Sequence, residues 1–164
     1  MGEALIMAIA ALILGLLYSL FSKSKSTQKR EALQNPKDID ANISYGNELV
    51  ERKQYDEALQ FFNNIDRSIS AMHNLNADFQ KGFIYYQKGN FKESKQNFEL
   101  VIKSPEAYKK DYHELVALSY FFIGGYYYLD NDLSNAKAYK QKAIEHNGEL
   151  AVFKIDQFEG YFDL

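Results

Sequence analysis

Apolar side chains recur along most of this chain at intervals of three and four residues, which is the period of an α-helix with one buried face. Between residues 38 and 147 the periodic stretches alternate with short polar breaks, namely "RKQ", "KGN" and "DND". Breaks of this composition are typical of tight turns. The aromatic run at residues 120–128 fits a buried helix because helical periodicity flanks it on both sides. The pattern predicts an all-α protein.

Three segments of this helical region share one spacing. Each has a glycine (Gly46, Gly82, Gly124), an apolar residue nine places later (Tyr55, Phe91, Leu133) and a small residue twelve places later (Ala58, Ser94, Ala136). A glycine on one helix and a small residue on the next let the two helices of a hairpin approach closely. We therefore predict three helical hairpins between residues 38 and 147, with the glycines and small residues as their packing positions.

The spacing, and above all "YGNELVERKQYDEALQFF" at residues 45–62, resembles the tetratricopeptide repeat. The resemblance covers residues 38–147 and implies antiparallel helix pairs stacked in a right-handed superhelix. Lys81 and Lys140 depart from the family pattern, and both intervals between successive packing glycines are longer than the family's period. We interpret the extra length of the second interval as two added turns of the third hairpin's first helix, starting at Ser104 and Pro105.

The resemblance also implies a concave groove lined by the first helix of each hairpin. Its lining would be Ile43, Asn47, Val50, Phe79, Phe83, Tyr86, Phe121, Gly125 and Tyr128. Such an aromatic, largely uncharged groove suits a protein or peptide partner. The alternative is that Phe83, Tyr86 and the other rings pack into neighbouring helices. Recognition of a C-terminal carboxylate is disfavoured, since only Asn47 matches the family's residues for that task.

Residues 4–21, "ALIMAIAALILGLLYSLF", carry no charge. As a helix they would span about 27 Å, close to the hydrocarbon thickness of a bilayer. A cleaved secretory signal needs a basic region before the apolar run, but Glu3 precedes this one. We predict a transmembrane anchor at residues 1–22. Because the basic segment "KSKSTQKR" follows it, we expect the N-terminus outside and the repeats in the cytoplasm, with a bacterial inner membrane as the setting.

The small residues of the predicted span share one helix face. They are Ala4, Ala8, Ala11, Gly15 and Ser19. Transmembrane helices associate by close backbone approach over small side chains, so this face is a candidate packing surface for another span. The alternative is that alanine and glycine are simply common in any span.

The remaining segments connect and close the predicted repeats. Residues 23–37 are polar, which is typical of a linker. We interpret residues 148–164 as a C-terminal capping helix, because the last repeat of a stack exposes an apolar flank. The residues that share one side of it are Leu150, either Phe153 or Lys154, Phe158 and Tyr161. The alternative is a detachable motif that inserts into another protein.

Charge and candidate chemistry narrow the function. Residues 31–164 carry 15 basic against 21 acidic side chains, the wrong balance for a nucleic-acid binder. The chain has no cysteine, so disulfides, thiolate catalysis and cysteine-based metal sites are excluded. His73, His113 and His146 lack further ligands at metal-binding spacing, and no Gly-Lys-Ser/Thr follows Gly124. We expect neither enzymatic activity nor a metal or cofactor.

These observations favour a membrane-anchored adaptor or assembly factor that holds a second protein for a membrane complex. Two alternatives stay open. One is a signal-anchored import receptor for basic, amphipathic presequences. The other is an accessory subunit, without chemistry of its own, of a membrane enzyme or transporter. The sequence does not set the oligomeric state.

Overall fold

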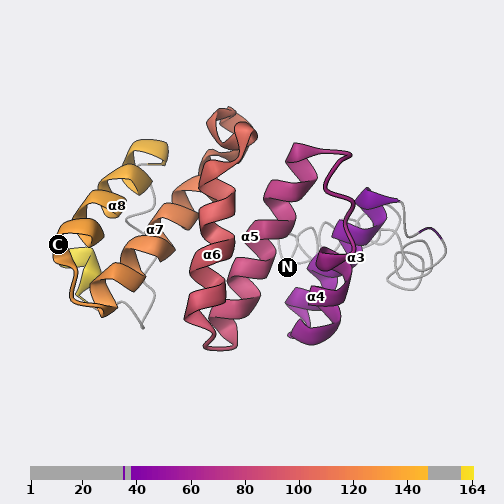
Figure 1. The fold of residues 1–164 in the computed structure, drawn as a ribbon, viewed down its shortest axis with the longest axis horizontal. Helices are drawn as coiled ribbons and strands as arrows, with labels where there is room; N and C mark the ends of the chain where they lie inside the picture. The colour runs from indigo at the N-terminus through magenta and orange to yellow at the C-terminus, as the bar shows by residue number, and fades with distance from the viewer. Residues whose placement is uncertain (1–34, 36–37, 148–159) are drawn as a thin grey trace, which may run out of the picture.

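The computed structural model describes residues 35, 38–147 and 160–164, and every regular element in this part of the chain is helical. Its six α-helices pair into three hairpins, which follow one another from right to left in Figure 1. The hairpins are α3 (Ile39–Glu51) with α4 (Tyr55–Asn63), α5 (Ala71–Gln87) with α6 (Phe91–Lys103), and α7 (His113–Leu129) with α8 (Leu133–His146). The predicted all-α architecture is confirmed for the described residues.

Each hairpin turns through one residue with a left-handed backbone. Lys53, Gly89 and Asn131 have φ angles of 60°, 75° and 60°, and each lies seven places after its packing glycine. The N–H of the following residue donates to the carbonyl five places earlier, at 2.8 Å in all three turns. This bond satisfies a carbonyl at the helix end, as in a Schellman motif. Of the three, only Gly89 adopts the left-handed conformation without a steric penalty.

Side-chain caps start three of the helices. Asp38, Ser70 and Asp132 each accept the N–H three places later, at 3.0, 3.4 and 3.1 Å. Such a cap satisfies one of the backbone donors that a helix start leaves without a partner. These three caps help to fix where α3, α5 and α8 begin, and of the three polar breaks only "DND" supplies one, through Asp132.

The segment between the second and third hairpins corrects the sequence-based prediction. Ser104 does cap the turn that follows it, but that turn is a 3₁₀ helix, η1 (Pro105–Tyr108), and a second one, η2 (Lys110–Tyr112), comes next. Lys109 between them has an extended backbone (φ −78°, ψ 136°), which ends the first turn. The helix α7 begins only at His113, so the predicted two-turn extension is wrong.

The interior forms two apolar clusters that share α5. Ala77 and Ile84 face the first hairpin and join the cluster built by α3 and α4. Leu75 and Phe79 belong to the larger cluster, which runs through α6, α7 and α8. Because one helix contributes to both clusters, the three hairpins form one continuous stack.

The predictions for the chain ends fall mostly outside the described residues. These include the span at residues 4–21 with its face of small residues, all of the linker but Asn35, and residues 148–159. Among the described residues, no helix combines the length and apolar character needed to cross a membrane. The last five residues lie beside α8 at the end of the stack, where Tyr161–Asp163 form the 3₁₀ turn η5 (Figure 1).

Candidate protein-interaction surface

A phenylalanine of the second helix covers the packing glycine in the first two hairpins. A Cβ atom built on Gly46 would lie 2.8 Å from the ring of Phe62, and one built on Gly82 would lie 2.8 Å from the ring of Phe98. Both rings are buried. The two phenylalanines follow their glycines at the same spacing, so the contact is a repeated feature. The sequence reasoning missed this pair although its spacing was visible.

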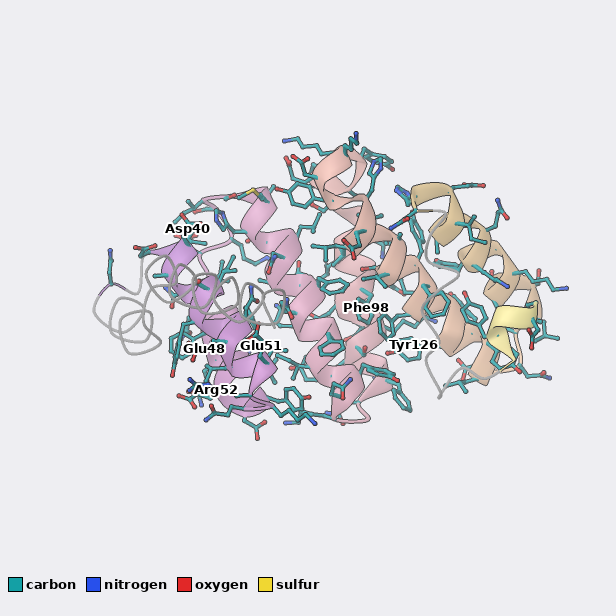
Figure 2. The ribbon with its side chains drawn as sticks, turned by 180° about the vertical axis from the view of Figure 1, so that it is seen from behind. Asp40, Glu48, Glu51, Arg52, Phe98 and Tyr126 are labelled. Atoms are coloured by element: carbon teal, nitrogen blue, oxygen red, sulfur yellow. The ribbon has the colours of Figure 1, made fainter. Side chains whose placement is uncertain are left out.

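The small residue of the second hairpin links that hairpin to the third. The Ser94 Oγ donates a hydrogen bond to the Gly82 carbonyl at 2.7 Å and lies 2.7 Å from the hydroxyl of Tyr126 on α7. A serine hydroxyl has one hydrogen and a carbonyl only accepts, so Tyr126 donates to Ser94. Burial raises the pKa of Tyr126, which keeps this donor protonated. Figure 2 shows Phe98 and Tyr126 between the second hairpin and α7.

The third hairpin has a different ring over its glycine. A Cβ atom built on Gly124 would lie 1.9 Å from the hydroxyl of Tyr161, near the C-terminus. The small residue of this hairpin, Ala136, is fully buried, and its carbonyl accepts a hydrogen bond from Tyr161 at 3.4 Å. All six predicted packing residues are buried.

The predicted groove residues lie at two depths. Phe79 and Phe121 are buried, whereas Asn47, Val50, Phe83, Tyr86 and Tyr128 are partly exposed. Phe79 packs edge-on against Phe98, with ring centroids 5.6 Å apart, so it acts as a core residue. The ring of Tyr86 lies 6.5 Å from that of Phe83 and 5.0 Å from that of Phe122, so an aromatic row crosses from α5 to α7, with Phe83 and Tyr86 partly exposed and Phe122 buried.

Amide groups flank this aromatic row on the side of the first hairpin. The side-chain oxygens of Asn47 on α3 and Asn76 on α5 have no hydrogen-bond partner within the described part of the chain. Both oxygens are buried, so these amides lie beneath the surface beside the partly exposed rings. The α3–α5 end of the face therefore differs in chemistry from its aromatic centre.

An acidic edge borders the first hairpin. Asp40, Glu48 and Glu51 lie along α3, and Arg52 forms an ion pair with Glu48 (Figure 2). The Asp40 side chain is 88% exposed and lies 2.7 Å from His73 Nε2 on α5, which ties the starts of these two helices together. Glu48 is buried and paired with Arg52, so the exposed carboxylates of this edge are Asp40 and Glu51, which favour a basic ligand over an acidic one.

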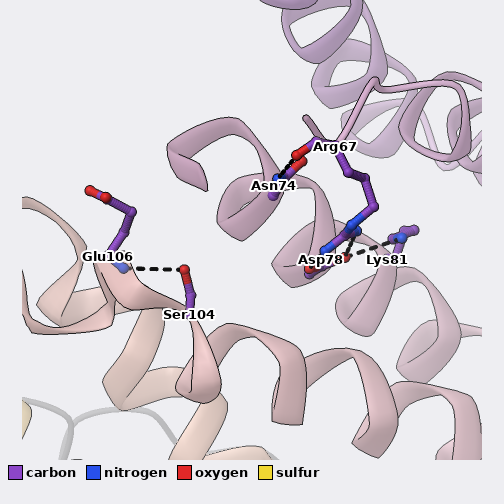
Figure 3. Close-up of polar contacts among 6 residues, drawn as sticks. All are labelled: Arg67, Asn74, Asp78, Lys81, Ser104 and Glu106. Atoms are coloured by element: carbon purple, nitrogen blue, oxygen red, sulfur yellow. Dashed lines mark hydrogen bonds and ion pairs between the residues drawn. The ribbon is translucent and has the colours of Figure 1, made fainter. Parts of the chain in front are cut away.

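A buried carboxylate fixes the junction between the first two hairpins (Figure 3). Asp78, only 2% exposed, accepts two hydrogen bonds from Arg67 at 2.8 and 2.7 Å and pairs with Lys81 at 3.2 Å. Asn74 donates to the Arg67 carbonyl at 2.8 Å. Bidentate pairing of this kind holds a loop in one geometry. The Asp78 carboxylate also accounts for Lys81. This residue departs from the repeat pattern, and its charge is paired with Asp78.

Two histidines meet at the far end of α7 and α8. The rings of His113 and His146 are 5.5 Å apart, and Tyr120 stacks on His146 at 5.4 Å. Burial, and secondarily the neighbouring His113, lowers the pKa of His146, so its neutral ring is the form that packs here. The contact is an aromatic one within a helix pair.

Comparison with known proteins bears on this arrangement. A family model described as tetratricopeptide repeat matches residues 79–108. The matched segment takes in the C-terminal half of α5, all of α6 and η1, and so falls on the second hairpin. No curated protein matches the chain. The chain thus contains a tetratricopeptide repeat, and the match indicates a role in protein–protein interaction.

Proposed function

We propose that this protein is a membrane-anchored adaptor or assembly factor. The apolar segment at residues 4–21 docks in a membrane complex, and the cytoplasmic hairpins hold a helix or an extended peptide of a second protein. The observation that carries the proposal is the repeat match at residues 79–108, which falls on the hairpin bearing the partly exposed rings of Phe83 and Tyr86. Aromatic side chains at a surface supply large contact area and are frequent interface anchors.

The binding face follows from the exposure of its side chains. Phe83, Tyr86 and Tyr128 each offer part of a ring while the rest packs against the core. A ring held on one side loses little further freedom when a partner covers the other side, so binding orders few groups.

Site-specific photo-crosslinking in native membranes tests the proposal. A crosslinker at Phe83 is expected to capture a protein partner, and one at Gly15 a membrane protein. Lys92, exposed on α6, is the matched control position and is expected to capture neither. Equal capture from Phe83 and Lys92, or capture from neither, would contradict the adaptor function.

The acidic edge supports a second candidate, an import receptor for basic presequences. The exposed carboxylates of Asp40 and Glu51 on α3 would attract a positively charged, amphipathic segment. The crosslinker at Phe83 separates the two functions, because a receptor would capture newly made precursor chains and an adaptor would capture one stable partner. Binding through the acidic edge also weakens steeply with added salt.

A further inference from the structure

One side of the stack gathers the starts of three helices. The helices α3, α5 and α7 begin on this side and α4, α6 and α8 end there, because the two helices of each hairpin are antiparallel. His73 at the start of α5 lies 2.7 Å from Asp40 at the start of α3, so the first two hairpins begin side by side. The opposite side carries the hairpin turns. In Figure 1 the helix starts lie along the top and the turns along the bottom.

The two sides are named by their residues. The start edge comprises residues 38–40, 64–73, 103–113 and 144–147. The turn edge comprises residues 51–55, 87–91 and 129–133.

Large apolar side chains are exposed at the start edge. Tyr108 on η1 and Ile69 before α5 are 79% and 57% exposed, the highest values among the large apolar side chains that the structure describes, and Met72 is 42% exposed. Their neighbours Ala107 and Leu75 are buried in the larger apolar cluster, which holds the backbone beneath Tyr108 and Met72 in place. One exposed apolar side chain is ordinary, but three at one edge indicate a surface that something covers.

The chain enters the stack at the same edge. The helix α3 begins at Ile39, and the segment at residues 23–37 joins it to the proposed membrane anchor. This segment reaches about 50 Å at most, so the start of α3 stays within that distance of the bilayer. A tethered surface has a high effective concentration at its target, so even a weak contact with lipid becomes well populated.

Charge indicates which kind of lipid surface the start edge fits. Four Lys and Arg side chains stand there against six Asp and Glu side chains. Glu106 pairs with Lys109, and the exposed side chains of Lys110 and Asp111 next to them add one charge of each sign. Attraction to anionic lipid needs clustered Lys and Arg, which this edge lacks. Insertion of apolar side chains between headgroups has no such requirement, so the start edge suits a neutral lipid surface.

We propose that the start edge rests on the bilayer, with the side chains of Ile69, Met72 and Tyr108 among the lipid headgroups. Tyrosine is favoured at this depth because its ring is apolar and its hydroxyl stays hydrated. The contact turns the hairpin turns away from the bilayer, so the face that bears Phe83 and Tyr86 opens sideways to a partner in the cytoplasm. This inference rests on the proposed membrane anchor.

Nitroxide labels on the full chain, reconstituted in phosphatidylcholine vesicles, test the contact. The chain has no cysteine, so an introduced cysteine carries the label at one defined position. Labels at Ile69→Cys and at Tyr108→Cys are expected to lie about 5–10 Å inside the headgroup boundary and to be shielded from a water-soluble nickel chelate. The matched controls are Leu129→Cys and Leu133→Cys on the turn edge, where the native side chains are 48% and 42% exposed. Equal access of the chelate at both edges would overturn the proposal.

Removing the other apolar side chains tests whether they hold the edge at the lipid. With the label at Ile69→Cys, adding Met72→Ser and Tyr108→Ser is expected to return the label to water. Adding Leu129→Ser and Leu133→Ser instead should leave it in the lipid. All of these side chains are exposed, so the changes should leave the fold intact. A label that stays in the lipid without Met72 and Tyr108, or that leaves the lipid at high salt, would overturn the apolar contact.

Flotation of the vesicles separates the two proposals. A chain that does not float with the vesicles lacks the membrane anchor, which would contradict both the proposed function and the contact that rests on it. A chain that floats while its start-edge labels stay open to the chelate would contradict the contact alone. A chain that floats with those labels shielded supports both.

Discussion

The hydrogen-bond chain from Tyr126 through Ser94 to Gly82 predicts that a second substitution restores part of the stability lost through the first. Both hydroxyls are buried, and Tyr126 donates to Ser94 because Ser94 donates to the Gly82 carbonyl. Ser94→Ala removes the acceptor of a buried donor, which costs about 1–3 kcal/mol, and a bond worth about 1 kcal/mol. The higher helix propensity of alanine offsets about 0.5 kcal/mol. We expect a net loss of about 2 kcal/mol.

Tyr126→Phe has a smaller effect because it leaves no donor without an acceptor. Ser94 still donates to Gly82, so the loss is about 1 kcal/mol. In the double variant both hydroxyls are gone, and an alanine faces a phenylalanine. The double variant should therefore be more stable than Ser94→Ala alone, by about 1 kcal/mol. Adding Tyr126→Phe to the Ser94→Ala variant is therefore expected to restore part of the lost stability.

Urea unfolding followed by circular dichroism measures the four free energies of this cycle. An unchanged dependence on urea across the set shows that the same surface unfolds in each variant. The single Ser94→Ala variant is expected to have the lowest midpoint of the four. A double variant whose loss equals the sum of the two single losses would refute the shared hydrogen-bond chain.

Three further outcomes follow from the described contacts, all measured by denaturant unfolding of the purified chain. Lys53→Gly should stabilise by about 1 kcal/mol and Gly89→Ala should destabilise by a similar amount, because both residues have left-handed backbones; the opposite signs would contradict the shared turn. Asp78→Asn should cost about 2 kcal/mol, since it removes the buried carboxylate that pairs with the largely buried Lys81 and accepts two hydrogen bonds from the half-exposed Arg67, and a loss below about 0.5 kcal/mol would contradict this. The contribution of Tyr126 to the free energy of unfolding should be complete below about pH 10 and should fall as pH rises further, because burial raises the pKa of Tyr126 and favours its neutral form. The Tyr126→Phe variant should show a weaker loss of stability with rising pH.

The hairpins were predictable because their determinants are local. A glycine and a small residue twelve places later indicate a contact between two helices that are adjacent in the chain, and the turn that joins these helices is short. The equivalent turn residues Lys53, Gly89 and Asn131 show why even unlike sequences such as "RKQ" and "DND" close in the same way. Helical periodicity plus spacing is enough at this level.

The errors arose where local signals do not decide the outcome. Ser104 and Pro105 mark a helical start, but the same signal begins a 3₁₀ turn, and only the extended backbone at Lys109 ends it. Lys140 stood out in the sequence as a departure from the repeat pattern, yet its consequence lies far along the chain at Tyr161. Contacts at that separation depend on tertiary packing, which periodicity cannot report.

The groove prediction illustrates the same limit on the functional face. Repeat register identified which residues of α5 and α7 lie near the surface, but it could not assign depth. Phe79 and Phe121 pack into the core, whereas Phe83, Tyr86 and Tyr128 keep part of each ring exposed. The difference is set by tertiary packing, since Phe79 lies against Phe98 of α6 and Phe121 against Tyr161.

The central claim is that close helix approach at a glycine–ring contact builds the first two hairpins, and Gly82 with Phe98 tests it most directly. A leucine at position 82 would meet the Phe98 ring, which already lies 2.8 Å from a Cβ built there. Unfolding in urea should show a loss of at least about 3 kcal/mol for Gly82→Leu, and Phe98→Ala in the same chain should recover part of it by making room for the new side chain. A Gly82→Leu chain as stable as the unaltered protein, or a double variant with fully additive losses, would contradict the account.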